Sequence, residues 1–566
     1  MIFIKLLFMR TFLFLLCISF NTITSQNKIL NEGNKPLDIP IILSGTYGEL
    51  RTNHFHSGID IKTKGIEGLN VYSYDNGYVS RIKISHGGYG KALYIKHPNG
   101  STSLYAHLKK FSKKIEEIVK KKQYERMSYE IEFFPKENEI QINKNEIIAF
   151  SGNTGGTTGP HLHFELRDKN QIPINPLKIT DISILDNKPP HINSLFYKTI
   201  YSDKQNEVKI KRLSNSLYIS DSIRISGKIG FGIIAYDKHD LANNNNGVSK
   251  IETFIDKGNI LTISFDSISF DQTKHINTFI DYSYFKNNKK RIQKLFIEDY
   301  NPLSLYSNNK NNGYLLIEEN KSYTYEVSIS DVNGNNSKLI VPIIGTALNT
   351  KTNKKSKNKE FKFIDVKKDY DFSFNNAKVY INNGTFYKNL NIEISYRNDT
   401  LSISKDTIAL LKPITIYLNT DRYNDSTKNH LFIAKLSDDN KMSNYVYTTD
   451  ELNSKKAITK SLGKFILKQD TISPSISTIG FKNNDWISNF SNLKIKIKDL
   501  ESGIKSYSGW INDKWVLFEL NTKKGVLTYD FNDKIISDAK NDLRVEVIDN
   551  VGNKTVYKTT FYRKPN

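Results

Sequence analysis

A stretch of alternating residues occurs twice in the chain, and both copies end in the turn Asp-x-x-Gly-Asn. The copies are Glu-Val-Ser-Ile-Ser-Asp-Val-Asn-Gly-Asn at 326–335 and Arg-Val-Glu-Val-Ile-Asp-Asn-Val-Gly-Asn at 544–553. Two further pairs of segments correspond in the same order: 186–192 with 470–476, and 247–251 with 502–506. Alternation with a period of two is typical of a half-buried strand. The correspondence therefore predicts two copies of one β-sandwich unit.

A chain of 566 residues is long enough for three or four domains of roughly 100–200 residues each. We expect a mainly β fold in which a small antiparallel β-sheet domain precedes three β-sandwich domains. The first and last sandwiches resemble the immunoglobulin-like modules of exported bacterial proteins. The expected boundaries are 1–25 for a signal peptide, 26–185 for a histidine-rich domain with a helical insertion near 109–137, 186–348 and 362–468 for two sandwiches separated by a polar linker at 349–361, and 469–566 for the last sandwich.

The N-terminal segment is typical of a secretory signal. Lys5 and Arg10 precede an apolar run at 12–18 that is too short to span a bilayer. No later run of about 18 apolar residues is present, so we expect no transmembrane segment downstream. Export to the periplasm, the cell envelope or the medium is the prediction. The chain's single cysteine, Cys17, lies in the apolar run, so the mature protein must hold any metal with His, Asp or Glu.

Basic residues outnumber acidic ones by 81 − 59 = 22. A positive chain favours anionic partners, which include nucleic acid, anionic lipid and an acidic wall polymer. Most of the excess is lysine dispersed along the sequence, and such lysines are more often solvated than part of a binding patch. Together with the export signal this argues against a nucleic-acid partner.

Histidines are concentrated near the N-terminus. Seven of the eleven lie between positions 54 and 163: His54, His56, His86, His97, His107, His161 and His163. The other four have no partners at metal-ligand spacing and are interpreted as ordinary surface or packing residues: His191, His239, His275 and His430.

Two short motifs bring chemistry to this region. His56 and Asp60 form His-x-x-x-Asp, and His161 and His163 form His-x-His within an apolar alternating run. Residues i and i+2 of a strand face the same side, so the second motif presents two imidazoles together. Imidazole and carboxylate are suitable zinc ligands, and a catalytic zinc keeps three protein ligands and one open position.

Four motifs in order resemble the lysostaphin-type (LytM-like) zinc peptidases, which cut peptide bonds of bacterial peptidoglycan. They are His56-x-x-x-Asp60, Tyr105-Ala106-His107-Leu108, Ser151-Gly152-Asn153-Thr154-Gly155, and Gly159-Pro160-His161-Leu162-His163-Phe164-Glu165. The resemblance covers about residues 40–180. It implies one zinc ion held by His56, Asp60 and His163, and catalytic roles for His107 and His161.

Several residues near these motifs keep two interpretations. His54 supports the site or is merely structural, and Glu165 either orients a metal ligand or faces solvent. The glycines at 152, 155, 156 and 159 line a substrate groove or belong to ordinary loops. The Lys-rich segment 109–137 forms a basic lip beside the groove or a solvated amphipathic helix, of which the second is favoured.

The leading functional prediction is an exported zinc endopeptidase that cleaves peptidoglycan cross-links. Its β-domains would space it or dock it at the envelope, which leaves other envelope proteins open as partners. Two alternatives are a non-catalytic regulator of other wall hydrolases with the same fold and an envelope scaffold or adhesion protein, since the β-domains make up most of the length.

Overall fold

The computed structural model describes residues 35–200, 204–347, 361–536 and 538–564. The predicted signal peptide and almost all of the predicted linker lie outside the described residues. Strands dominate from β1 to β45 and the helices are few and short, so the prediction of a mainly β chain is confirmed. No helix among the described residues is long and apolar enough to span a membrane.

The first unit, residues 35–185, is built on an antiparallel sheet. The strand order is β1 (Leu43–Gly45), β2 (Ile59–Lys62), β11 (His161–Arg167), β6 (Thr102–Ala106), β5 (Lys91–Lys96), β4 (Gly77–Ile84) and β8 (Ile131–Phe133), with β9 (Gln141–Ile142) beside β4 and β12 (Pro173–Ile174) beside β11. A second sheet joins β3 (Asn70–Tyr72), β10 (Ile147–Phe150) and β7 (Lys110–Phe111). Two helices complete the unit: α2 (Lys113–Glu125) and α3 (Pro176–Ile179).

The two faces of the large sheet have different tasks. Ile59, Ile61 and Phe164 are fully buried in the main core of the unit. Because successive side chains of a strand point to opposite faces, Asp60 and His163 project from the other side of the same strands. Apolar burial on one face therefore fixes the register that presents the polar residues on the other.

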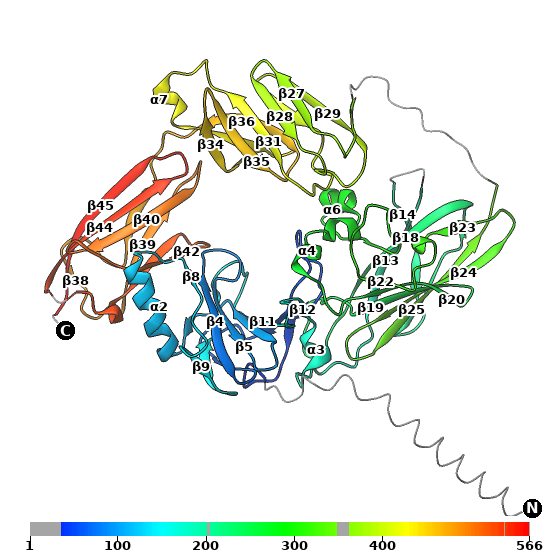
Figure 1. Ribbon diagram of the computed structural model, residues 1–566, viewed down its shortest axis with the longest axis horizontal. Helices are drawn as coiled ribbons and strands as arrows, with labels where there is room; N and C mark the ends of the chain where they lie inside the picture. The colour runs from blue at the N-terminus through cyan, green and yellow to red at the C-terminus, as the bar shows by residue number, and fades with distance from the viewer. Residues whose placement is uncertain (1–34, 201–203, 348–360, 537, 565–566) are drawn as a thin grey trace, which may run out of the picture.

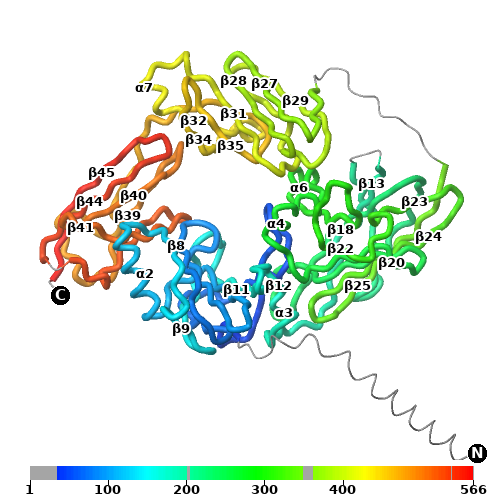
Figure 2. Tube along the Cα trace, in the orientation of Figure 1, coloured from blue at the N-terminus to red at the C-terminus, as the bar shows by residue number. Residues whose placement is uncertain are grey.

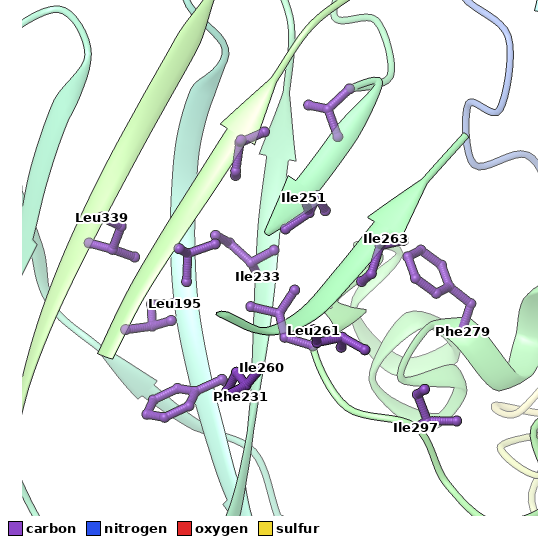
Figure 3. Close-up of a cluster of buried hydrophobic side chains, with 14 of the residues drawn as sticks. Leu195, Phe231, Ile233, Ile251, Ile260, Leu261, Ile263, Phe279, Ile297 and Leu339 are labelled. Carbon is purple, nitrogen blue, oxygen red and sulfur yellow. The ribbon is translucent and has the colours of Figure 1, made fainter. Parts of the chain in front are cut away.

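The second unit, residues 186–347, has two sheets. One has the order β14 (Asn206–Val208), β13 (His191–Thr199), β18 (Gly227–Tyr236) and β21 (Gln293–Lys294), with β23 (Leu315–Ile317) also on β18. The other has the order β15 (Ile210–Arg212), β16 (Leu217–Ser220), β25 (Asn336–Ile344), β24 (Ser322–Ser330), β19 (Lys250–Ile255), β20 (Gly258–Ser264) and β22 (Tyr306–Ser307), with β17 (Ile223–Arg224) beside β25. Between β20 and β23 lie α4 (Phe270–Thr273), α5 (Ile276–Phe279), α6 (Tyr282–Asn288) and the 3₁₀ turn η1 (Asn311–Gly313). Side chains of both sheets meet in one core, where Leu195, Ile233 and Leu261 lie together (Figure 3).

The third and fourth units, residues 361–469 and 470–564, each consist of two sheets around a core. The third has β26 (Phe361–Ile364), β29 (Leu390–Arg397), β30 (Thr400–Ile403), β36 (Gly463–Gln469), β32 (Leu431–Leu436) and β33 (Ser443–Tyr445) in one sheet, β27 (Tyr370–Phe374), β28 (Ala377–Ile381), β31 (Ile414–Asn419), β35 (Ser454–Thr459) and β34 (Thr448–Glu451) in the other, and the helix α7 (Asp425–Lys428). The fourth has β37 (Ser475–Ile479), β39 (Asn492–Lys498), β43 (Val526–Asp530) and β42 (Phe518–Asn521) in one sheet, β38 (Asp485–Trp486), β45 (Lys554–Tyr562), β44 (Lys540–Asp549), β40 (Ile504–Ile511) and β41 (Lys514–Trp515) in the other, and the 3₁₀ turn η2 (Phe531–Asp533).

The four units follow one another around a ring, and the last returns to the first (Figures 1 and 2). Polar contacts mark three of the junctions: Lys286 with Asp406 between the second and third units, Lys468 with Glu501 between the third and fourth, and Lys91 with Glu519 between the fourth and first. The last pair joins residues far apart in the sequence, with Lys91 Nζ 2.8 Å from Glu519 Oε1.

Helix α2 lies within the segment predicted as a helical insertion, and it faces the fourth unit. Lys120 and Tyr124 both bind the carboxylate of Asp533, and the ring of Tyr124 meets Trp515 edge-on at 5.4 Å between centroids. Leu517 enters the buried core of the first unit. The helix is therefore a contact surface between units, which neither of the two predicted interpretations included.

Candidate metal centre and active site

Three neighbouring strands position the polar residues of the first unit. In the antiparallel register Asp60 on β2 faces His163 on β11, and His163 faces Ala106 on β6. Directly paired residues of an antiparallel sheet point to the same side, so Asp60 and His163 lie side by side. His161 shares their face from two residues before His163, and His107 directly follows the end of β6.

The sheet and the loop before β2 bring three potential ligand atoms together. His56 Nε2 and His163 Nδ1 are 3.1 Å apart, and Asp60 Oδ1 lies 3.1 Å from the first and 2.8 Å from the second. All three side chains are buried. These are the three residues for which the sequence predicted a ligand role.

Each of the two imidazoles has a second ring nitrogen outside this group of three atoms, and its hydrogen bond decides which nitrogen carries the proton. His56 Nδ1 donates to the carbonyl oxygen of Thr46 at 2.8 Å, and His163 Nε2 donates to Glu165 Oε1 at 2.9 Å. In the neutral imidazoles the lone pairs of His56 Nε2 and His163 Nδ1 therefore both face Asp60 Oδ1. Three acceptors that converge in a buried space repel one another unless a cation lies among them, so this donor set fits a metal ion such as zinc.

Glu165 binds the side of the His163 ring that is turned away from Asp60. It is fully buried and accepts hydrogen bonds from Ser57 Oγ at 2.6 Å, from the hydroxyl of Tyr89 and from Arg167 Nε at 2.8 Å. Burial raises its pKa, but the charge of Arg167 and the hydrogen bond from His163 outweigh it and hold the pKa of Glu165 at about 2. A carboxylate behind a metal-binding imidazole fixes its tautomer and increases its basicity. Of the two predicted interpretations, the structure shows the one in which Glu165 orients His163.

The pKa values of His163 and Asp60 reflect the same hydrogen-bond network. Burial lowers the pKa of His163, yet hydrogen bonds with Asp60 and Glu165 raise it to about 9. Burial raises the pKa of the Asp60 carboxyl. The charge of His56, together with hydrogen bonds from His161 and His163, outweighs burial and holds this pKa well below its usual range. A proton and a metal ion therefore compete for the lone pair of His163 Nδ1.

His107 and His161 lie together beside the three potential ligands. Their ring centroids are 4.8 Å apart, and His161 Nε2 lies 3.5 Å from Asp60 Oδ1. His107 Nδ1 donates to the carbonyl oxygen of Thr154 at 2.8 Å, and His161 Nδ1 donates to that of Gly159 at 2.9 Å, so both Nε2 atoms stay available. Burial, together with the charges of His163 and His161, lowers the pKa of His107 to about 3. His107 is therefore neutral near pH 7.

The first unit is similar to known peptidases. Residues 54–124 match the model described as Peptidase family M23. The chain contains an M23 peptidase domain. Over 130 residues it is 35% identical to the DD-carboxypeptidase/endopeptidase Mpg of Neisseria meningitidis, which covers 23% of this chain and 24% of that protein. Over 123 residues it is 31% identical to the peptidoglycan DD-endopeptidase ShyA of Vibrio cholerae, which covers 22% of each chain.

The chain spans about a quarter of the length of these curated relatives. Among solved structures, the catalytic domain of the antimicrobial peptidase lysostaphin from Staphylococcus simulans is 21% identical with a TM-score of 0.19, and the match covers 24% of this chain and 90% of that one. A zinc-containing peptidase from Vibrio cholerae is 24% identical with a TM-score of 0.19, and the match covers 25% of this chain and 39% of that one.

The cluster of His56, Asp60 and His163 in the M23 domain opens into a cleft of about 930 Å³. His56, Asp60, His107, His161 and His163 all line it. The second unit contributes three further lining residues: Ile268, Phe270 and Thr273. Sequence reasoning missed this contribution, because nothing in the local pattern around these residues indicates which distant loop they face.

Phe55 joins the two units next to the metal centre. It lies between His54 and His56 in the sequence, yet its ring is buried in the core of the second unit, 5.8 Å from the ring of Phe279. Its backbone nitrogen donates to Thr273 Oγ1 at 2.8 Å. The loop that carries His56 is therefore anchored outside the M23 domain. A large aromatic residue in the middle of a ligand motif was the one sequence signal of this contact.

The other residues that the sequence singled out, His54 and four glycines, either line the cleft or pack against backbone. His54 lines the cleft but is exposed, donates to the carbonyl oxygen of Thr52 and takes no part in the ligand cluster. Gly156 and Gly159 line the cleft, whereas Gly152 and Gly155 pack against backbone. A Cβ at Gly152 would lie 2.3 Å from the nitrogen of Lys109, so that position needs glycine for close packing.

Proposed function

We propose that the protein is an exported zinc endopeptidase that hydrolyses peptide cross-links of bacterial peptidoglycan. The observation that carries the proposal is the convergence of His56 Nε2, Asp60 Oδ1 and His163 Nδ1 in a buried cluster beside two further histidines. The names of the relatives that match the M23 domain supply the substrate class. Export rests on the predicted signal at 1–25. Retention of all five residues argues against a non-catalytic regulator.

The three ligand atoms would hold one zinc ion. When bound there, zinc would polarise the scissile carbonyl and lower the pKa of a water molecule. Glu165 keeps the Nδ1 lone pair of His163 directed at the ion, and the Thr46 carbonyl does the same for His56 Nε2. The arrangement leaves the cleft side of the centre open to substrate.

The two further histidines move protons. His107 Nδ1 donates to the Thr154 carbonyl, so its Nε2 is the nitrogen that can accept the proton that the attacking water loses. His161, on the strand beside the ligands, would first take up a proton on Nε2 from solvent and then deliver it to the leaving nitrogen as the carbon–nitrogen bond breaks. Water supplies the hydroxyl that the carbonyl carbon gains, and proton exchange with solvent restores both imidazoles.

The test uses the mature full-length chain, purified peptidoglycan and a measurement of bound zinc. We expect about one zinc per chain and release of cross-linked fragments, with both lost in His56→Ala and in Asp60→Ala. His54→Ala is the matched control, since it removes a cleft histidine two residues away that does not reach the ligand cluster. His107→Ala should keep zinc and lose turnover. Intact cross-links from about pH 6 to about pH 9 with zinc-loaded protein would overturn the enzyme proposal.

A further inference from the structure

Two acidic clusters lie outside the M23 domain: a buried one in the second unit, and one in the fourth unit in which Asp499 is half-buried. The first contains Asp186, Asp237 and His239, and the second contains Asp470, Asp499 and Asp549. In each cluster the potential ligand atoms lie within 4.8 Å of one another. His239, which the sequence predicts to be an ordinary surface or packing residue, is buried and lies against Asp237.

The two clusters occupy equivalent places in the fold. Asp186 precedes β13 and Asp237 directly follows β18, the partner of β13; Asp470 precedes β37 and Asp499 directly follows β39, the partner of β37. The third equivalent carboxylates belong to the repeated Asp-x-x-Gly-Asn turns, at Asp331 and Asp549.

The same hydrogen bond ties each turn to the start of its unit. Asn335 Nδ2 donates to the carbonyl oxygen of Asp186 at 3.1 Å, and Asn553 Nδ2 donates to that of Asp470 at 2.9 Å. Three carboxylates at matching positions in two copies are a feature of the unit and not of one local sequence.

The first cluster contains a carboxylate oxygen that has no hydrogen-bond partner. Asp186 is only 6% exposed, and its Oδ2 makes no hydrogen bond. His239 Nε2 lies in ion-pair contact with Asp237 Oδ2, at 3.2 Å. No lysine or arginine among the described residues pairs with Asp186, Asp237 or Asp331. A buried, unsatisfied carboxylate is costly, so a missing cationic partner is indicated.

The pKa values of the clustered aspartates also indicate a missing cation. Burial and the nearby charge of Asp237 raise the pKa of Asp186 to about 7, and burial also raises that of Asp331. In the fourth unit, burial followed by the charges of Asp470 and Asp549 raises the pKa of Asp499. Like charges gathered in one place disfavour ionisation unless a cation compensates them.

We propose that each cluster binds a divalent cation of the calcium class. The carboxylates of Asp186 and Asp237 would bind the ion in one site, with the charge of Asp331 close by, and those of Asp470, Asp499 and Asp549 would bind it in the other. Calcium prefers oxygen ligands and takes six to eight of them, so backbone carbonyls and water would complete the shell. Asp186 and Asp470 lie at the start of the second and fourth units, so each cation would fasten the start of its unit to the rest of that unit.

The experiment measures calcium binding by the full-length chain after removal of metals with a chelator. Calorimetric titration with Ca²⁺ should give two sites, and the melting temperature should rise with Ca²⁺ concentration. Asp237→Asn and Asp499→Asn should each remove one site, whereas the exposed residues changed in Asp221→Asn and Asp513→Asn should leave both. His56→Ala should also leave both, which separates these sites from the M23 centre.

The aspartate variants report on the proposal through stability as well. Asp237→Asn keeps the shape of the side chain and removes a repelling charge, so without Ca²⁺ its melting temperature should equal or exceed that of the parent. With Ca²⁺ the order should reverse. Absence of Ca²⁺ binding at millimolar concentration, binding of Zn²⁺ alone, or equal Ca²⁺ stoichiometry in the parent and both variants would each overturn the proposal.

Discussion

Glu165→Gln isolates the contribution of the carboxylate behind His163. The side chain is fully buried, and its pKa of about 2 against an ordinary value of 4.5 corresponds to about 3 kcal/mol of favourable interaction with the ionised form. Arg167, His163 and Ser57 share that interaction. A share of roughly 1–3 kcal/mol for His163 predicts zinc affinity about 10- to 100-fold weaker in the variant, as for other carboxylates behind metal-binding histidines.

The change also affects folding. Glutamine leaves the buried guanidinium of Arg167 without a countercharge, and the free energy of unfolding should fall by about 3 kcal/mol. Zinc affinity is therefore measured by competition with a chromophoric chelator on protein whose circular dichroism is native. Glu132→Gln on β8 is the matched control, since Glu132 also pairs with an arginine, Arg81, but lies outside the site. A folded Glu165→Gln variant with zinc affinity within about twofold of the parent would refute the reasoning.

Three further predictions concern pH, the cleft and the ring. The raised pKa of His163 stabilises zinc-free protein fully below about pH 6.5, and this is lost as pH rises through about 9; the lowered pKa of Glu165 contributes above 4.5 and is lost as pH falls towards 2. The free energy of unfolding of zinc-free protein, measured in urea, should therefore be highest between pH 4.5 and about pH 6.5. A free energy that only rises or only falls with pH would contradict this prediction. Phe270→Ala should lower kcat/KM by about 5-fold or more with zinc content unchanged, because an aromatic wall of the cleft is lost; unchanged kcat/KM would exclude Phe270 from substrate contact. Asp533→Ala should loosen the junction between the first and fourth units, seen as a larger radius of gyration in solution scattering, because Lys120 and Tyr124 both lose their partner; an unchanged radius would show that the Lys91–Glu519 pair and Leu517 hold the junction without it.

The sequence predicted the parts of the site that lie within single motifs. His-x-His on a strand and His-x-x-x-Asp before one are local patterns, and the resemblance to known peptidases combined them. What depends on distant segments was not predictable. Phe270 reaches the cleft from the second unit, and His239 meets Asp186 only after two strands of that unit pair. The Lys-rich helix was predicted near its observed place, but its partner Asp533 lies more than 400 residues further along the chain.

Phe55 has a consequence for how the protein can be divided. Its ring lies in the core of the second unit, and Tyr47 of the M23 domain is buried there too, with its hydroxyl accepting from the nitrogen of Ile268 at 2.7 Å. A fragment cut after residue 185 would expose both aromatic rings and free the loop that holds His56. The M23 domain therefore depends on the second unit, and chimeras that attach this domain to other chains should include the second unit as well.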